Sequence, residues 1–268
     1  MQRRAFLRGA MAAGLAFAGG VGVEALTERS AFEITEFPVG PPTGGASVMR
    51  IAWMSDMHRS HATPRWVLEQ AVEACQKAEP HVILLGGDYV SSTWDLPLVP
   101  ECAEILGRLR APHGVFYVLG NHDYVAGAGT IRSAFQRAGL QELTNTSTLL
   151  SPGLHLVGVD DVWLGKPDVP RALAGTTAGT RIVFSHNPRI FPRLRENDCT
   201  LICGHTHGGQ INIPLVPNPC LRSWKTYVRG WFAEGNSRMY VNRGVGTLTL
   251  PIRVNCRPEI TIFRVLTG

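Results

Sequence analysis

Apolar runs of strand type alternate with helical patterns along most of the chain. Continuous hydrophobic runs predict buried strands at 48–54, 81–85, 115–119, 154–159, 181–184 and 200–202. Apolar residues at helical spacing predict helices at 64–78, 98–109 and 130–138. Weaker strand patterns cover 147–150 and the tail from 238 to 266. Continuous apolar strands that alternate with helices favour an α/β fold whose sheets are covered on their outer faces.

The beginning of the chain has the pattern of an export signal. Three arginines within the first eight residues precede an uncharged stretch, Gly9–Val23, which is shorter than the ~20 apolar residues that span a bilayer. The adjacent arginines followed by Phe-Leu-Arg resemble a twin-arginine signal, which predicts export by that machinery to the periplasm or cell envelope. An uncleaved amphipathic or anchoring helix is the alternative. We therefore expect a signal over 1–25, a linker over 26–47 and a folded domain over 48–268.

Composition and charge exclude several classes of protein. Hydrophobic residues make up 44% of the 268 residues, which is enough to build a core and argues against disorder. The 29 glycines and 18 prolines predict many turns and argue against a coiled coil or a helical bundle. The net charge of +5, without a Lys/Arg cluster, gives no reason to expect a nucleic acid polymer as a partner.

The cysteines form neither a Cys-x-x-Cys motif nor the spacing of a small disulfide-rich domain. We interpret them as buried free thiols that pack as small hydrophobic residues, with a disulfide as the alternative. The six positions are Cys75, Cys102, Cys199, Cys203, Cys220 and Cys256.

Polar side chains follow five of the predicted strands, at the point where each strand ends. These residues are Asp56, His58, Asp88, Asn121, His122, His186, His205 and His207. Because the carboxyl ends of buried strands are where open α/β sheets place their sites, we expect these side chains to converge. Two residues that are two apart in an extended chain point to one side, so Asp56 and His58 should act as a pair, as should His205 and His207.

The number and type of these donors predict a metal site. Carboxylate, imidazole and amide groups suit divalent first-row metals. Without His122 the set still has seven candidate ligands, which exceeds the four that one tetrahedral site requires. A pair of metals that share one carboxylate fits this number better. Asp88 is the natural shared ligand, since it stands alone at the end of its strand.

The ordered set D-x-H, G-D, G-N-H-D, H and G-H-x-H resembles the calcineurin-like metallophosphoesterases, from about residue 50 to residue 265. The segment Gly-His-Thr-His-Gly-Gly-Gln from 204 to 210 and Asn-Arg-Gly-Val-Gly from 242 to 246 look like a smaller branch. That branch contains exported bacterial phosphodiesterases and is related to enzymes that act on lipid-linked UDP-sugars. The resemblance implies an α/β fold of four layers, an αββα sandwich of two mixed β-sheets flanked by helices, with a dinuclear metal centre.

The resemblance also implies a role for each motif residue. One divalent ion (Mn, Fe or Zn) would be bound by Asp56, His58 and His207, and a second by Asn121, His186 and His205. Asp88 would bridge the two ions, and His122 would stand beside the substrate without binding metal. After Asp88 the protein-phosphatase branch continues Val-Asp-Arg-Gly, where this chain has Val-Ser-Ser-Thr from residue 90. The acid that orients the catalytic histidine in that branch is therefore missing, and Asp123 and Asp95 are the two candidates to replace it. Phosphoprotein substrates become less expected.

These residues predict a metal-dependent phosphoesterase, in the first place a phosphodiesterase, whose metal-activated hydroxide attacks a small-molecule or lipid-linked phosphoester. His122 would protonate the leaving group. A pyrophosphatase that acts on UDP-sugar or lipid-linked nucleotide substrates is the alternative. A second alternative is a catalytically silent metal-binding scaffold that serves as an interaction module.

Two further features have two interpretations each. Arg243 either clamps a phosphate oxygen of the substrate or forms a structural salt bridge. The stretch Ile213–Phe232 either makes a peripheral membrane contact and grips a lipid-like leaving group or packs its aromatic rings on the sheet, which we favour. Its aromatic residues are Trp224, Tyr227, Trp231 and Phe232.

Overall fold

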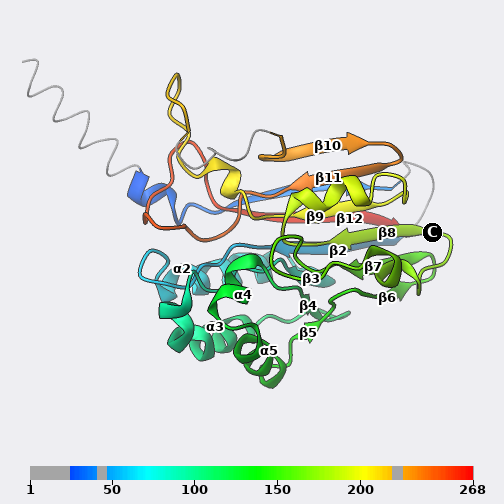
Figure 1. Ribbon diagram of the computed structural model, residues 1–268, viewed down its shortest axis with the longest axis horizontal. Coiled ribbons are helices and arrows are strands. Elements are labelled where there is room, and N and C mark those ends of the chain that lie inside the picture. Colours follow the sequence, from blue (N-terminus) through cyan, green and yellow to red (C-terminus); the bar gives the residue numbers. More distant parts are fainter. Residues whose placement is uncertain (1–24, 41–46, 219–225, 268) are drawn as a thin grey trace, which may run out of the picture.

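Within residues 25–40, 47–218 and 226–267, which are those that the computed structural model describes, the chain forms two six-stranded mixed β-sheets. Figure 1 shows the two sheets stacked, with helices on the outside. The first sheet has the order β1 (Glu33–Val39), β12 (Glu259–Thr267), β2 (Ser47–Met54), β3 (Val82–Leu85), β4 (Val115–Tyr117) and β5 (Gln141–Glu142). The second has the order β10 (Gly230–Glu234), β11 (Ser237–Val241), β9 (Thr200–Cys203), β8 (Thr180–Phe184), β7 (Leu154–Gly158) and β6 (Thr146–Ser151).

Helices cover the outer face of each sheet. The first sheet carries α2 (Arg65–Lys77), α3 (Val99–Leu106), α4 (Asn121–Ala126) and α5 (Ala128–Arg137), with the 3₁₀ turn η1 (Thr93–Leu98) before α3. The second carries α6 (Val169–Leu173) and the 3₁₀ turn η2 (Pro188–Arg193), and η3 (His207–Gly209) follows β9. This arrangement confirms the expected sandwich of two mixed sheets with flanking helices.

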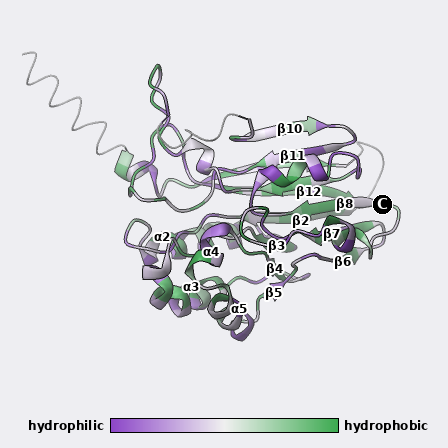
Figure 2. Cartoon of the chain, in the orientation of Figure 1, coloured by the Kyte–Doolittle hydropathy of each residue, from purple (hydrophilic) through white to green (hydrophobic). Residues whose placement is uncertain are grey.

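Alternating side chains on the strands build the layers. On β2, Ile51 and Trp53 enter the core between the two sheets, whereas Ala52 and Met54 enter the core under the helices. Successive side chains of a strand point to opposite faces, so a strand buried on both faces is apolar throughout. Figure 2 shows this hydrophobic character along the central strands.

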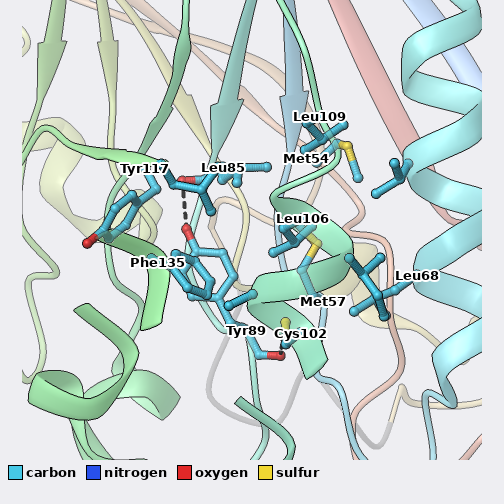
Figure 3. Close-up of a cluster of buried hydrophobic side chains, with 14 of the residues drawn as sticks. Met54, Met57, Leu68, Leu85, Tyr89, Cys102, Leu106, Leu109, Tyr117 and Phe135 are labelled. Atoms are coloured by element: carbon cyan, nitrogen blue, oxygen red, sulfur yellow. Dashed lines mark hydrogen bonds between the residues drawn. The ribbon is translucent and has the colours of Figure 1, made fainter. Parts of the chain in front are cut away.

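The core under the helices also holds the loops that carry the motif residues. Figure 3 shows the Tyr89 ring among the side chains of β3, β4, α3 and α5, with its hydroxyl donating to the Leu85 carbonyl oxygen at 3.0 Å. A second bond from this hydroxyl reaches the Val118 carbonyl oxygen at 2.9 Å. Because a buried hydroxyl needs such partners, this tyrosine fixes the loop after β3 to the sheet.

The linker predicted over 26–47 is wrong in part, because it contains a strand. β1 pairs in parallel with β12 from Glu33 against Glu259 to Val39 against Val265. Its sequence, EITEFPV, mixes charged residues with a proline and so resembles a loop. A strand at the edge of a sheet has one partner and tolerates proline, which explains why β1 gave so little signal. Of the other edge strands, β5 and β10 were not predicted either, whereas β6 was.

The remaining predictions about the chain have different outcomes. The five cysteines in the described residues are buried free thiols, as interpreted, whereas Cys220 lies outside them. The predicted export signal also lies outside, apart from Ala25. In the described part of the chain, we find no helix with both the length and the apolarity needed to cross a membrane.

Candidate metal centre

The predicted site residues lie in loops at the carboxyl ends of parallel strands. β2, β3 and β4 run parallel in one sheet, as do β8 and β9 in the other, so the loops after them reach the same end of the sandwich. Backbone hydrogen bonds hold the loops together. The Asp56 N–H donates to the Gly87 carbonyl oxygen at 3.0 Å, and the His58 N–H donates to the Asp88 carbonyl oxygen at 2.9 Å. Across the sheets, the His205 N–H donates to the Asp56 carboxylate at 3.0 Å. The expected convergence is therefore present in the structure.

The backbone geometry that produces this convergence differs from the one we predicted. We expected extended segments in which alternate side chains share one side. Instead, five of the seven predicted ligands have left-handed backbone conformations, with φ between 44° and 72°. They are Asp56, His58, Asp88, His205 and His207. Such conformations cost of order 1–3 kcal/mol each in non-glycine residues and cluster at functional sites.

The potential ligand atoms form overlapping groups centred on Asp88. Its Oδ2 lies 3.1 Å from His186 Nε2 and 3.4 Å from His58 Nε2. His186 Nε2 in turn lies 2.9 Å from His205 Nδ1. In the part of the chain that the structure describes, Asp88, His186 and His205 form one group of donors that lie within 4.8 Å of one another.

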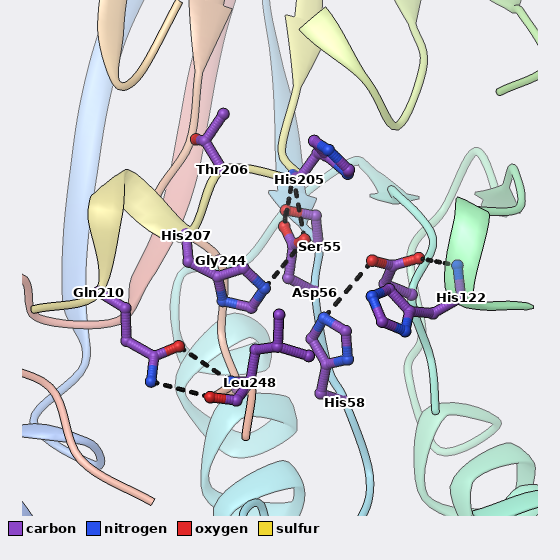
Figure 4. A network of polar contacts seen from close by, with 12 residues as sticks. Ser55, Asp56, His58, His122, His205, Thr206, His207, Gln210, Gly244 and Leu248 are labelled. Atoms are coloured by element: carbon purple, nitrogen blue, oxygen red, sulfur yellow. Dashed lines mark hydrogen bonds and ion pairs between the residues drawn. The ribbon is translucent and has the colours of Figure 1, made fainter. Parts of the chain in front are cut away.

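A neighbouring group consists of Asp56, His58 and His207, whose donor atoms also lie within 4.8 Å of one another. His207 Nε2 is 3.6 Å from Asp56 Oδ1. Figure 4 shows the His207 ring directed toward the Asp56 carboxylate, with the His58 ring beside them. His58 is close to both groups, so the donors form one continuous cluster.

Unpaired buried atoms indicate that these residues fit metal ions. His58 Nε2, Asn121 Oδ1 and His207 Nδ1 are buried and form no hydrogen bond among the described residues, although His58 Nε2 faces Asp88 Oδ2 at 3.4 Å. Each unsatisfied buried polar atom costs roughly 1–3 kcal/mol. Buried nitrogen and oxygen atoms with free lone pairs are the donors that a divalent cation requires. The residues present therefore fit the divalent metal ions that the motif set predicts.

The carboxylates and one histidine carry the charge of the site. Burial acts to raise the pKa of Asp88, but His186 and His58 hold it well below its usual value of 3.8. Burial raises the pKa of Asp56 above the same value. Burial favours the neutral form of His186, yet the carboxylates of Asp88 and Asp56 raise its pKa to about 10. A positive charge on His186 thus offsets the buried carboxylates, and metal binding would displace that proton.

Two other histidines are held neutral. Burial lowers the pKa of His205 and His207 well below their usual value of 6.5, and the neighbouring His186 and His58 act in the same direction. Neutral imidazole is the form that binds metal. These residues can therefore bind a cation without first losing a proton.

His122 is oriented by a backbone carbonyl group rather than by an acid. Its Nδ1 lies 2.5 Å from the Ser91 carbonyl oxygen, and because a carbonyl only accepts, Nδ1 carries the proton. Its backbone N–H donates to Asp88 Oδ1 at 2.9 Å. The hydroxyl of Ser91 also contacts His58 Nδ1 at 3.1 Å. Ser91 was missed as a site residue, although the sequence placed it in the stretch that departs from the protein-phosphatase branch.

Neither acid considered for that role orients His122. Asp123 accepts backbone N–H bonds from Asp88 at 2.7 Å and Tyr89 at 2.9 Å, so it fixes the loop after β3. Burial and the Asp88 charge raise the pKa of Asp123 to about 7. Asp95 accepts a hydrogen bond from the Ser92 hydroxyl at 2.7 Å.

A pocket of about 430 Å³ lies over the cluster. On one side it is lined by Asp88, Asn121, His122, His205 and His207. Its other side is largely apolar and includes Trp163, Ile211, Leu248 and Leu250. Charged and apolar walls together suit a substrate that carries both a phosphate and an apolar group.

Sequence reasoning missed two residues that shape this pocket. The Trp163 ring lies 4.6 Å from the His205 ring, and no motif marks its position. Gln210 holds the apolar wall: its Nε2 donates to the carbonyl oxygens of Leu248, Leu250 and Ile252 at 3.1 Å, and its Oε1 accepts from the Leu248 N–H at 2.9 Å. The one signal for Gln210 in the sequence is its position at the end of the segment that contains the G-H-x-H motif.

The structure favours the structural interpretation of Arg243. Its Nε lies 2.8 Å from Glu259 Oε2 and its Nη2 lies 3.0 Å from Glu33 Oε2. Arg243 does not line the pocket over the cluster within the described chain. The side chain instead ties the loop after β11 to β12 and β1.

The aromatic stretch packs on the sheet where it is described. The Trp231 ring lies 5.1 Å from Tyr240 and 5.7 Å from Phe37, and the Tyr227 ring lies 6.0 Å from Phe191. This supports the interpretation that we favoured for the rings. Trp224 lies outside the described residues.

The chain is similar in sequence and in fold to several known proteins. The model of the calcineurin-like phosphoesterase family matches residues 49–209. Phosphodiesterase YaeI of Escherichia coli (strain K12) is 33% identical over 99% of this chain and 100% of its own length. The uncharacterized metallophosphoesterase YkuE of Bacillus subtilis (strain 168) is 30% identical over 98% of this chain and 97% of its own. The crystal structure of TT1561 of Thermus thermophilus shares the fold, with a TM-score of 0.51 and 14% identity over 74% of this chain and 91% of that one.

Proposed function

Because the chain belongs to the calcineurin-like phosphoesterase family, we propose that it is a phosphodiesterase that depends on two divalent metal ions. The position of the Asp88 carboxylate carries this proposal. It lies within 3.4 Å of histidines from two different loops, between two groups of donors, as a shared ligand must. Against the effect of burial, His186 and His58 hold its pKa well below the usual value, which favours the ionised form that binds a cation.

The donor groups suggest how the ions are held. Asp56, His58 and His207 would hold one ion, and Asn121, His186 and His205 would hold the other, with Asp88 common to both. Mixed nitrogen and oxygen donors accept manganese, iron or zinc. When bound, such ions neutralise the charge of a phosphodiester and lower the pKa of an attacking water.

His122 would supply the proton for the leaving group. Since its Nδ1 donates to the Ser91 carbonyl oxygen, its Nε2 is the atom left to act on substrate in the pocket that it lines. A positioned acid of this kind contributes typically ~10²–10⁴-fold in rate. Trp163 and Leu248 would receive an apolar leaving group on the opposite wall.

That apolar wall is the observation that favours a second candidate, a pyrophosphatase acting on UDP-sugar or lipid-linked nucleotide substrates. We further propose that the protein acts in the periplasm or cell envelope after export by the twin-arginine machinery. The paired arginines and the uncharged stretch that follows them support this location.

Metal analysis of the purified full-length chain, coupled to turnover of phosphate monoesters, aryl diesters and pyrophosphate esters, tests the proposal. Asp88→Asn should lose bound metal and activity together. His122→Ala should lose roughly 10²–10⁴-fold in turnover while keeping its metal. His113→Ala, a change at an exposed histidine outside the motifs, is the control and should alter neither.

The outcomes separate the candidates. Cleavage of a bis-aryl phosphate without cleavage of UDP-sugars supports the phosphodiesterase, and the reverse supports the pyrophosphatase. A chain that binds metal but cleaves no ester would be a scaffold. A chain that takes up no divalent ion would refute the proposal altogether.

A further inference from the structure

An exposed apolar loop projects from the end of the molecule that carries the metal pocket. We call Ile213, Leu215, Val216 and Leu250 the apolar tip; Leu215 is fully exposed and the other three side chains are about half exposed. Figure 1 shows the loop after η3 extending away from the sandwich. The sequence carries no charged residue from 210 to 221 or from 244 to 252. Contiguous exposed apolar residues of this kind mark interaction surfaces, whereas single exposed ones are ordinary.

Hydrogen bonds tie the apolar tip to the fold. The Asn212 N–H donates to the Val254 carbonyl oxygen at 2.9 Å, and the Asn255 side chain donates to the Asn212 carbonyl oxygen at 2.9 Å. Gln210 fastens the two loops together through the backbone of Leu248 and Leu250. The base of the tip is thus held in place, so its apolar residues are presented together.

The apolar surface is continuous with the pocket. Ile211, Leu248 and Leu250 line the pocket over the candidate metal ligands, and the chain passes directly from Ile211 to the exposed Ile213 and Leu215. A group that rests on the apolar tip therefore lies next to the mouth of the pocket.

Basic side chains lie at the base of the apolar tip. Arg29 Nη1 donates to the Pro251 carbonyl oxygen at 3.3 Å, and Arg229 Nη1 donates to that of Asn255 at 3.4 Å. Arg257, two residues further on, is exposed. Two acids lie on this side: Glu28 accepts backbone N–H bonds at 2.7 and 3.0 Å in the same loop, and Glu33 pairs with Arg243 at 3.0 Å. The rim of the tip therefore carries net positive charge.

The beginning of the described chain lies at the same end. The Arg253 N–H donates to the Ala25 carbonyl oxygen at 3.1 Å, and the adjacent Leu26 is about half exposed. The first described residues therefore lie beside the loop that carries Leu250.

We propose that the apolar tip inserts into the interface of an anionic phospholipid bilayer, with the mouth of the metal pocket turned toward the membrane surface. Insertion would remove the exposed Leu, Ile and Val side chains from water. The arginine rim would remain at the level of the headgroups, where the negative surface potential attracts it. A second copy of the chain is a poorer occupant, because pairing two tips would bring two basic rims together.

Flotation of the full-length protein with vesicles tests this proposal. Vesicles of phosphatidylcholine are compared with vesicles that also contain phosphatidylglycerol, for the wild type and two variants. Leu215→Ser should weaken partitioning roughly tenfold or more, because one leucine loses its transfer from water. Leu149→Ser is the matched control: Leu149 is also more than half exposed, but it lies on β6, the strand at the edge of the second sheet. Its partitioning should equal that of the wild type.

Every variant keeps residues 1–24, so their contribution to binding is the same in each comparison. Equal partitioning of wild type and Leu215→Ser, or equal binding to neutral and anionic vesicles, would overturn the proposal. So would self-association in sedimentation velocity that Leu215→Ser abolishes. The flotation assay requires no turnover, so this inference and the proposed activity can fail separately. Hydrolysis of a soluble aryl phosphodiester should be unchanged in Leu215→Ser, since Leu215 does not line the pocket.

Discussion

Replacing Gly120 by alanine should disable the metal centre through a single added methyl group. Gly120 lies between β4 and Asn121, directly against the loop after β3. Its φ of −102° is one that alanine adopts freely, so the change introduces no backbone strain. A Cβ at this position would lie 2.2 Å from Asp88 Oδ1 and 2.6 Å from the Asp88 backbone nitrogen. The perturbation is therefore steric and is directed at the proposed shared ligand.

The size of the effect follows from these distances. Cβ atoms essentially never approach other heavy atoms within 3.0 Å, so the Asp88 carboxylate oxygen must retreat from 2.2 Å to at least that distance. Such a shift also breaks the 2.9 Å hydrogen bond from the His122 N–H to Asp88 Oδ1. Misplacing a catalytic group by about 1 Å costs on the order of 10²-fold in rate. Overpacking a well-filled site adds a loss of about 1–3 kcal/mol in the free energy of unfolding.

The assay compares kcat/KM on a bis-aryl phosphate, metal content and thermal unfolding for Gly120→Ala and Gly129→Ala. Gly129 lies in α5 and has open space where a Cβ would be added. Alanine there should leave activity unchanged and raise stability by less than the ~0.8–1 kcal/mol of a helix interior, because Gly129 lies in the first turn. If Gly120→Ala keeps wild-type metal content and wild-type kcat/KM, the assignment of Asp88 as the shared ligand is wrong.

Three further outcomes are expected. The buried Arg253 guanidinium donates to four backbone carbonyl oxygens of its loop. Because unpaired buried acceptors cost roughly 1–3 kcal/mol each, Arg253→Met should lower the free energy of unfolding by about 3 kcal/mol or more. An unchanged denaturation midpoint would contradict this. Burial acts to raise the pKa of Glu259, but Arg243 lowers it below 4.5. The stability that Glu259 contributes is therefore complete above pH 4.5 and is lost as the pH falls through the depressed folded-state pKa. Glu259→Gln should flatten the acid side of a plot of Tm against pH. Burial raises the pKa of the Cys75 thiol to about 12, and the other described cysteines are buried too. A Cys220→Ser chain should therefore react with a thiol reagent at neutral pH only after unfolding. Rapid labelling of the native chain would refute the burial of these cysteines.

The candidate site was predictable from the chain because each ligand follows an apolar strand. A strand that is buried on both faces is recognisable as a continuous apolar run, and the polar residues after it stand out. Asp88 after Val82–Leu85 and His186 after Thr180–Phe184 are examples. Their order and type indicated a shared metal site before any geometry was known.

Other features carried no such pattern. β1 was interpreted as part of a linker, because an edge strand with a single partner tolerates Glu, Thr and Pro. The pairing of Asp56 with His58 was expected from an extended chain, but both residues adopt left-handed conformations that only the surrounding loops impose. The carbonyl group of Ser91 orients His122, and a backbone acceptor leaves no trace in the sequence.

The sequence by itself therefore determined the kind of donors, their order along the chain and the strands that carry them, since these depend on local hydrophobic patterns and side-chain chemistry. Only the tertiary structure decided which donor atoms lie within reach of one another, which atom orients His122, and that Arg243 pairs with Glu259. Those relations join residues from different loops and both sheets, and their distances are set by how the sheets pack rather than by any neighbour in the chain.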